Sequence, residues 1–255
     1  MKKGLLPILF ALILTTASKS SFAWGKTGHD IVGQIAYRLL DDSTRAIVQS
    51  YLGNLSFEEA ANWMDDQRSN SYYNYMRSWH YINLEKGISY TPTEERNSLT
   101  VMHTAVMELR NHLTMKKKDV RRDILLIFHL VGDLHQPMHN GYGSDRGGNS
   151  VEITSPLVSG NLHSVWDTQI LEYKNITADT CMVLYNSLDA ATIKEYSKIN
   201  ELKWMYQSRA YLDAAYNFEN NFLDKNYIDS NAEIIKKQLL IGGIRLASIL
   251  KEVFK

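Results

Sequence analysis

The chain has 255 residues, of which 44% are hydrophobic, 22% are charged and only one, Cys181, is a cysteine. This size and apolar content suit one globular domain, and a single cysteine excludes an internal disulfide. Its 28 basic and 28 acidic residues balance, so the chain lacks the basic excess by which a protein surface normally holds nucleic acid. A polyanionic ligand would need another means of attachment.

The first element along the chain, residues 1–23, has the pattern of a secretory signal. Two lysines precede an apolar run from Leu5 to Leu14, and a polar stretch then ends on the small residue Ala23. A membrane-spanning helix would need ~20 apolar residues, so this run is too short to be an anchor. We expect cleavage between Ala23 and Trp24 and a secreted or periplasmic domain of residues 24–255. Three lysines leave with the signal, so 25 basic residues face 28 acidic ones and the mature net charge is −3.

Helical periodicity dominates the rest of the sequence. Apolar residues recur at helical intervals in "HDIVGQIAYRLL" and "DSTRAIVQSYL". Further helical patterns cover roughly residues 97–113, 120–135, 163–173, 203–221 and 230–253. Residues 140–162 are instead rich in glycine and turn formers, with room for one small hairpin around "SVEIT". The sequence therefore predicts an all-α fold: a single compact multi-helix domain with one long loop and at most a small β-hairpin.

Two His-x-x-x-Asp pairs are the main chemical signal. His129 and Asp133 are four residues apart on one expected helix, and His163 and Asp167 repeat the spacing on another, so each pair shares a helix face. One such pair alone is more typical of a surface ion pair. Two pairs, with His139 redirected by the preceding Pro137, indicate metal ligands that project inward from facing helices.

Other candidate ligands lie upstream. After signal cleavage, Trp24 would carry a free α-amino group five residues before His29, with a pKa of about 7.7–8.0, low enough for a metal to displace its proton. Asp65 occurs in "ANWMDDQR" and His80 in "SWHYIN". A histidine between aromatic residues is more often packed among them than bound to metal, so His80 alone would carry little weight.

Taken together, "WGKTGH", "ANWMDDQR", "WHYIN", "HLVGDLHQPMH", "DRGGN" and "NLHSVWD" resemble, in order and spacing, the motifs of the single-strand-specific zinc nuclease and 3′-nucleotidase family. This is the nuclease branch of a superfamily shared with zinc-dependent phospholipase C. The match covers most of residues 24–167. The resemblance implies a cleft with three Zn²⁺ ions as cofactors. Its implied metal ligands are Asp65, His80, His129 and Asp133 for one zinc; Asp133, Trp24 and His29 for a second; and His139, His163 and Asp167 for the third.

The resemblance also implies an activity. The protein would hydrolyse single-stranded DNA and RNA to 5′-phosphorylated nucleotides through attack of a zinc-activated water, with 3′-nucleotidase activity as a second reaction. Asp65, Arg68 and Asp133 are the expected catalytic residues, with Arg68 in the place of the family's phosphate-binding arginine. Tyr81 matches an aromatic that stacks on an unpaired base. Asn83 replaces an aspartate that contacts the base in fungal members, which leaves base preference open.

The substrates expected are therefore single-stranded nucleic acid and nucleotides, bound by a monomer with no membrane anchor and no stable protein partner. A phospholipase C using the same zincs is the alternative. The close spacing of Trp24 and His29, and Asp167 where phospholipases have glutamate, favour the nuclease. A zinc-stabilised binding protein is a non-enzymatic alternative that suits the absence of disulfides. It does not suit the third zinc, for which the resemblance implies coordination positions left open to water, as in catalytic zinc sites. His135 is expected either to contact a metal ligand or to lie on the surface.

Overall fold

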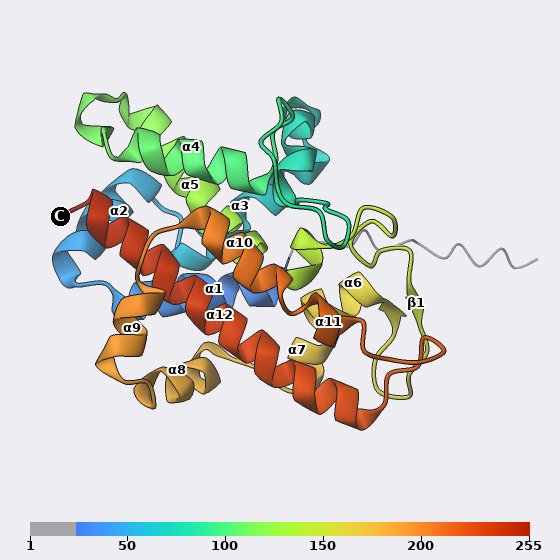
Figure 1. Cartoon of the computed structure of the whole chain (residues 1–255). Helices are drawn as coiled ribbons and strands as arrows, with labels where there is room; N and C mark the ends of the chain where they lie inside the picture. Colours follow the sequence, from blue (N-terminus) through green and yellow to red (C-terminus); the bar gives the residue numbers. More distant parts are fainter. Residues whose placement is uncertain (1–23) are drawn as a thin grey trace, which may run out of the picture.

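The computed structural model describes residues 24–255, which form a helical domain (Figure 1). The expected signal segment, residues 1–23, lies outside the described residues. The α-helices are α1 (Lys26–Leu39), α2 (Asp42–Leu52), α3 (Phe57–Asp66), α4 (Ser98–Leu109), α5 (Lys117–Leu134), α6 (Leu162–Ser164), α7 (Ile170–Tyr173), α8 (Ala178–Asn186), α9 (Ala190–Tyr196), α10 (Glu201–Arg209), α11 (Leu212–Ala215) and α12 (Lys225–Val253). Tighter or wider helical turns are η1 (Gln67–Ser69), η2 (Ser71–His80), η3 (His112–Thr114), η4 (Pro137–Asn140) and η5 (Val165–Gln169). The expected all-α fold is confirmed.

The long helix α12 forms one side of the core. It crosses the molecule in Figure 1 and packs on α1 and α8, with buried apolar residues over most of its length. Gly243 allows the close contact with α1, because a Cβ atom there would lie 2.4 Å from the side chain of Ile35. The close packing of these two helices fixes the position of α1, which carries His29.

Helix α5 occupies the centre of the domain between α3 and α4. Its residues 123–134 are buried without interruption, so the helix is surrounded by protein on all sides. A helix enclosed in this way presents side chains to the interior around its whole circumference. That burial explains how α5 can carry polar side chains such as His129 and Asp133 inside the domain.

Residues 141–161 form the long loop that the sequence predicts, with one small antiparallel sheet. Strand β1 (Glu152–Ile153) pairs with β2 (Gly160–Asn161), Glu152 opposite Asn161 and Ile153 opposite Gly160. The expected helix over 203–221 is wrong at its end. The helical turns stop at Ala215, and Asn220 and Asn221 adopt positive φ angles, which interrupt a helix.

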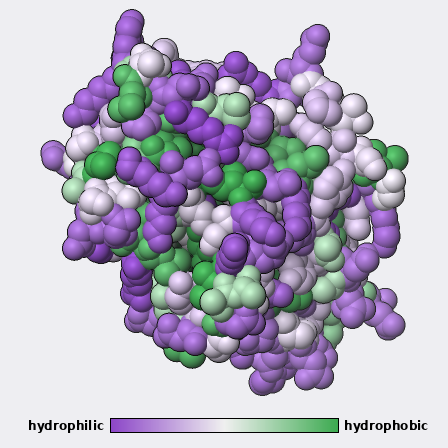
Figure 2. Space-filling model, turned by 60° about the vertical axis from the view of Figure 1, so that its left-hand side comes forward, coloured by the Kyte–Doolittle hydropathy of each residue, from purple (hydrophilic) through white to green (hydrophobic). Residues whose placement is uncertain are grey.

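On the face shown in Figure 2, hydrophilic side chains predominate and hydrophobic ones form small separate patches. Within residues 24–255, no helix combines the length and the apolar character that crossing a bilayer requires.

Candidate metal centre

The first cluster of potential ligands joins three elements. Asp65 comes from α3, His80 from the end of η2, and His129 and Asp133 from one face of α5. His129 Nε2 lies 2.9 Å from His80 Nδ1 and 3.3 Å from Asp133 Oδ2, and His80 Nδ1 lies 3.1 Å from the same Oδ2. Asp65 Oδ1 is 3.7 Å from both histidine nitrogens. Ligands held about 2.0–2.1 Å from a tetrahedral zinc lie roughly 3.3 Å apart, so the spacing of this cluster fits zinc.

The second cluster of potential ligands joins His139, which follows Pro137, to two residues further along the chain. His139 stands in η4, which begins with that proline, while His163 is in α6 and Asp167 in η5. His163 Nε2 lies 3.2 Å from His139 Nε2 and 3.1 Å from Asp167 Oδ2, and His139 Nε2 is 3.8 Å from Asp167 Oδ1. Asp167 lies in a turn of π-helix, a local widening that often occurs at functional sites. This cluster also has the spacing of a zinc site.

Asp133 stands between the clusters. Its Oδ2 faces His80 and His129, whereas Oδ1 lies 3.4 Å from His29 Nε2 and 3.6 Å from His139 Nδ1. Within residues 24–255, neither Asp133 Oδ1 nor either ring nitrogen of the fully buried His29 has a hydrogen-bond partner. Buried polar atoms are nearly always paired, so these atoms fit a place where a metal supplies the missing interaction.

Trp24 and His29 lie on the same side of α5. A Cβ atom added to Gly132 would lie 2.8 Å from His29 Nδ1, so the helix needs glycine there to accommodate that ring, and the Trp24 ring lies in ordinary contact with the same position at 3.7 Å. Trp24 is fully buried, and the next residue, Gly25, donates its N–H to the carbonyl oxygen of Asp167 at 3.0 Å. The start of the described chain therefore lies beside both ligand clusters.

Backbone carbonyls fix the orientation of three of the histidines. Nδ1 of His129 contacts the carbonyl oxygen of Ala61 at 2.7 Å, Nδ1 of His139 that of His80 at 2.6 Å, and Nδ1 of His163 that of Gly147 at 2.7 Å. A carbonyl oxygen can only accept, so each Nδ1 carries the hydrogen. Each Nε2 is then left with its lone pair toward the cluster, as metal-binding histidines require.

Burial and charge set the protonation of these groups. Burial lowers the pKa of His29 and of His80, and it lowers that of His139 to about 4. Burial also acts on His129 and His163, but the neighbouring carboxylates outweigh it and raise their pKa values, so a metal would displace a proton more readily from the first three rings than from these two. Burial opposes ionisation of Asp133, but the neighbouring His129 and His139 outweigh it and hold the pKa of this carboxyl well below its usual range. Neutral imidazoles and an ionised carboxylate are the forms that bind metal.

The expected substrate-binding residues lie at the edge of the first cluster. Arg68 Nε lies 2.7 Å from Asp65 Oδ1, and 27% of the Arg68 side chain is exposed. Tyr81 follows His80 and is 41% exposed, and Asn83 is also exposed. The backbone N–H of Ile82 donates to the carbonyl oxygen of His139 at 2.7 Å, so this exposed segment runs beside the second cluster.

One further residue of the "HQPMH" segment, Gln136, joins the centre. Gln136 is buried, and its side-chain amide donates to Asp167 Oδ1, which orients that carboxylate. Sequence reasoning missed this residue, and its position next to Pro137 was the one feature that could have pointed to it. His135 is not on the surface. It is fully buried and contacts Arg245 of α12, a partner 110 residues away that sequence analysis did not identify.

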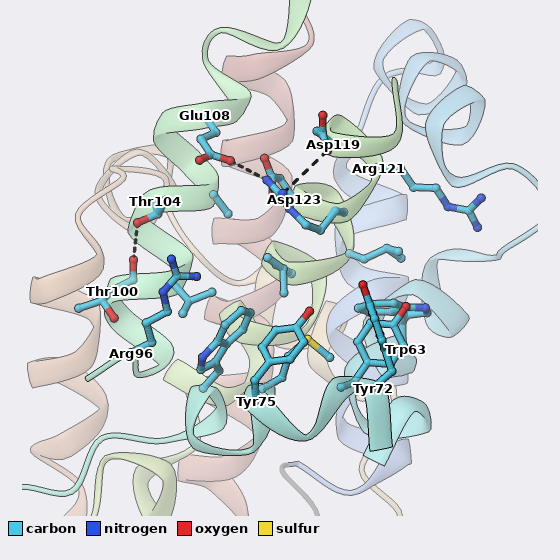
Figure 3. Close-up of a pocket in the computed structure, with 18 of the residues that line it drawn as sticks. Trp63, Tyr72, Tyr75, Arg96, Thr100, Thr104, Glu108, Asp119, Arg121 and Asp123 are labelled. Carbon is cyan, nitrogen blue, oxygen red and sulfur yellow. Dashed lines mark hydrogen bonds and ion pairs between the residues drawn. The ribbon is translucent and has the colours of Figure 1, made fainter. Parts of the chain in front are cut away.

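A hollow lined in part by residues of η2 shares no lining residue with the two ligand clusters. Its volume is about 810 Å³. Figure 3 shows aromatic side chains, including Trp63, Tyr72 and Tyr75, facing acidic residues of α4 and α5. Asp123 lies in the acidic wall and bonds Arg122, and burial raises the pKa of its carboxyl to about 7. The metal centre is thus recognised by its chemistry and not by the size of a cavity.

Comparison with known proteins gives relatives of one kind. Endonuclease 2 of Arabidopsis thaliana is 27% identical over 99% of both chains. Nuclease P1 of Penicillium citrinum is 23% identical over 90% of this chain and 97% of its own. Nuclease S1 of Aspergillus oryzae is 27% identical over 66% of this chain and 61% of its own.

The family model described as S1/P1 nuclease matches residues 24–255, which include every residue of both clusters. This match spans nearly the whole chain, and the full-length relatives carry the names of nucleases. The chain therefore belongs to the S1/P1 nuclease family, which confirms the prediction of a zinc-dependent, single-strand-specific nuclease over the phospholipase C alternative.

Proposed function

We propose that this protein hydrolyses single-stranded DNA and RNA to 5′-phosphorylated nucleotides, and 3′-nucleotides as a second substrate, with three zinc ions. The observation that carries the proposal is the convergence of the Asp65, His80, His129 and Asp133 ligand atoms, 2.9–3.7 Å apart in the measured pairs, beside a second convergent set. The remaining ligands would be Trp24 and His29 with Asp133 for a second zinc, and His139, His163 and Asp167 for the third.

Zinc in such a centre lowers the pKa of bound water toward ~7 and stabilises negative charge on phosphate oxygens. Three zinc ions would bring six positive charges against the carboxylates of Asp65, Asp133 and Asp167. Phosphate would then be attracted to a chain whose own mature charge is slightly negative. This supports a nucleic-acid substrate despite the absence of a basic excess in the sequence.

The chain's own groups would position the substrate. Arg68 presents a planar guanidinium at the edge of the first cluster, suited to donating to phosphate oxygens. Tyr81 offers an exposed ring on which a base can stack, and stacking on an exposed ring needs a base that is not paired within a duplex. Asn83 would contact the base edge through its amide. These roles together favour single strands over duplexes.

We also infer that the mature domain begins at Trp24. Its α-amino group would then ligate the zinc beside His29, and release of the signal would complete the site. The mature protein would act outside the cytoplasm as a monomer.

The test is a substrate panel with zinc-loaded protein that starts at Trp24. Single-stranded DNA, RNA, duplex DNA and phosphatidylcholine are incubated in parallel, and the product ends are identified by mass spectrometry. We expect 5′-phosphorylated products from both single strands and slower cleavage of the duplex. His163→Asn should abolish cleavage, whereas the matched control His103→Asn, which changes a largely exposed histidine paired with Glu201, should retain it. Release of diacylglycerol without nucleotides would contradict the proposal.

A further inference from the structure

A buried arginine of α12 has neutral hydrogen-bond partners. Arg245 is 3% exposed, and its Nη1 donates to His135 Nε2 at 2.6 Å. His135 Nδ1 donates to the carbonyl oxygen of Val131, so Nε2 can only accept and the ring is neutral. Nη2 of Arg245 donates to the side-chain oxygen of Gln207. Nε of Arg245 is buried, with no hydrogen-bond partner in residues 24–255.

No carboxylate of the described residues makes a hydrogen bond or an ion pair with this positive charge, and Glu195 attracts it only at longer range. The Arg245 guanidinium lies over the ring of Trp204 at 4.9 Å, a cation–π contact that offsets part of its desolvation. Buried charges in proteins are usually paired with an opposite charge, because an unpaired one is costly. Burial lowers the pKa of Arg245 to about 9, so the group remains a cation at neutral pH. A counter-anion is the missing partner.

A cavity of about 410 Å³ borders Arg245. It lies between the α9–α10 connection, α10 and α12, which are neighbours in Figure 1. Lys198 and Lys203 also line it, and both pair with Glu195, at 2.5 Å and 2.9 Å. Three cations and one carboxylate give the cavity a net charge of +2, in contrast to the acidic balance of residues 24–255.

We propose that this cavity binds a small oxyanion, phosphate or a carboxylate, with Arg245 as its principal ligand. Nε–H is the donor of the guanidinium that no group of the described residues occupies, and a charge-assisted hydrogen bond to an anion oxygen would satisfy it. Lys198 and Lys203 lie on the same cavity and add positive charge to it. The cavity is larger than one phosphate ion, so an organic group attached to the oxyanion would also fit. This proposal does not depend on the nuclease activity proposed above.

Gln207 provides a sharp test, because its side-chain oxygen already accepts from Arg245. Gln207→Glu keeps the shape and places a carboxylate against the guanidinium, so the protein itself would supply the missing anion. In buffer free of phosphate, we expect the Tm of this variant to exceed that of the wild type by a few degrees, on the order of 2–4 °C. Gln207→Met is the matched control, since it removes the acceptor without adding charge, and it should show no rise.

The second readout is the response to ligand. Inorganic phosphate, or acetate in a parallel arm, is titrated into zinc-loaded protein while Tm is recorded. Phosphate that binds at the zinc centre would contribute equally to all variants, because none of them changes a residue of that centre. We expect the wild type and Gln207→Met to gain more in Tm than Gln207→Glu, and the more effective anion identifies phosphate or carboxylate as the source. Equal responses of wild type and Gln207→Glu to both anions would overturn the proposal.

Arg245→Met tests the proposal by removing the proposed anion ligand itself. It removes the charge and retains an apolar side chain against Trp204, so it should lose the additional response to the anion whether its basal Tm rises or falls. If isothermal titration still finds the same number of phosphate sites in Arg245→Met as in the wild type, the arginine is not the ligand.

Discussion

Chelating the zinc would leave buried polar groups around Asp133 without partners. The clearest are the imidazole of His29 and Oδ1 of Asp133, which are fully buried and have no hydrogen bonds within the described residues. Each unsatisfied buried group costs about 1–3 kcal/mol, so these two account for roughly 2–6 kcal/mol. The total stability of a typical domain is about 5–15 kcal/mol. For a chain of this length, about 2–4 °C of Tm per kcal/mol then predicts a fall of roughly 4–24 °C.

Differential scanning calorimetry of zinc-loaded, chelated and zinc-restored protein measures this fall, and elemental analysis of the same samples confirms that the metal has left and returned. Zinc should restore the original Tm and magnesium should not, because imidazole nitrogens suit zinc better than magnesium. A chelated sample that has lost its zinc but unfolds within about 2 °C of the loaded one would refute the reasoning, since the orphaned atoms would then carry no such cost.

Three further outcomes test other parts of the structure. Asp133→Asn should lose both zinc and single-strand cleavage, because an amide binds two metals poorly; retention of the full zinc content and turnover in elemental and kinetic assays would contradict the bridging role. One extra Met before Trp24 converts the α-amino group into an amide, so zinc content and activity should fall at equal zinc supply; equal activity, with the Met verified by mass spectrometry, would exclude the amino ligand. Asp123 has a pKa of about 7 in the folded state against a usual value of 3.8, so its contribution to stability is present below pH ~4 and is lost as pH rises through 7. Asp123→Asn should therefore increase the free energy of unfolding at pH 8, by at most on the order of 4 kcal/mol, and a higher Tm than that of the wild type would record this. At pH 4 the Tm should change little; an equal effect at both pH values would show that titration is not the cause.

The local part of the metal centre was readable from the sequence. Residues four apart on a helix share a face wherever the helix lies, so the pairing of His129 with Asp133 needed no tertiary information. Helix α3 was not among the expected helices, although its start carries a local signal, the capping box of Ser56 and Glu59. Helix α9 has an N-cap residue, Asp189, but within the described chain none of its own residues is buried, so it lacks the apolar stripe by which helices are recognised.

Long-range contacts could not be predicted in the same way. Nothing in the local sequence indicates that His135 meets Arg245, because that contact depends on how α5 and α12 pack. The π-helical turn around Asp167 was equally hidden, since its hydrogen-bond pattern leaves no clear trace in the spacing of apolar residues. The helix expected over 203–221 is divided after Arg209 and ends at Ala215, ahead of the two asparagines whose left-handed backbone angles exclude a helix over residues 220–221.

His80 belongs to both halves of the metal centre through different atoms. Its imidazole faces His129 and Asp133, whereas its carbonyl oxygen holds the ring of His139. A shift of this one residue would disturb the two clusters together, and a metal that orders one would prepare the other. A single substitution that displaces His80 would therefore be expected to lower the zinc content of both clusters and not of one alone.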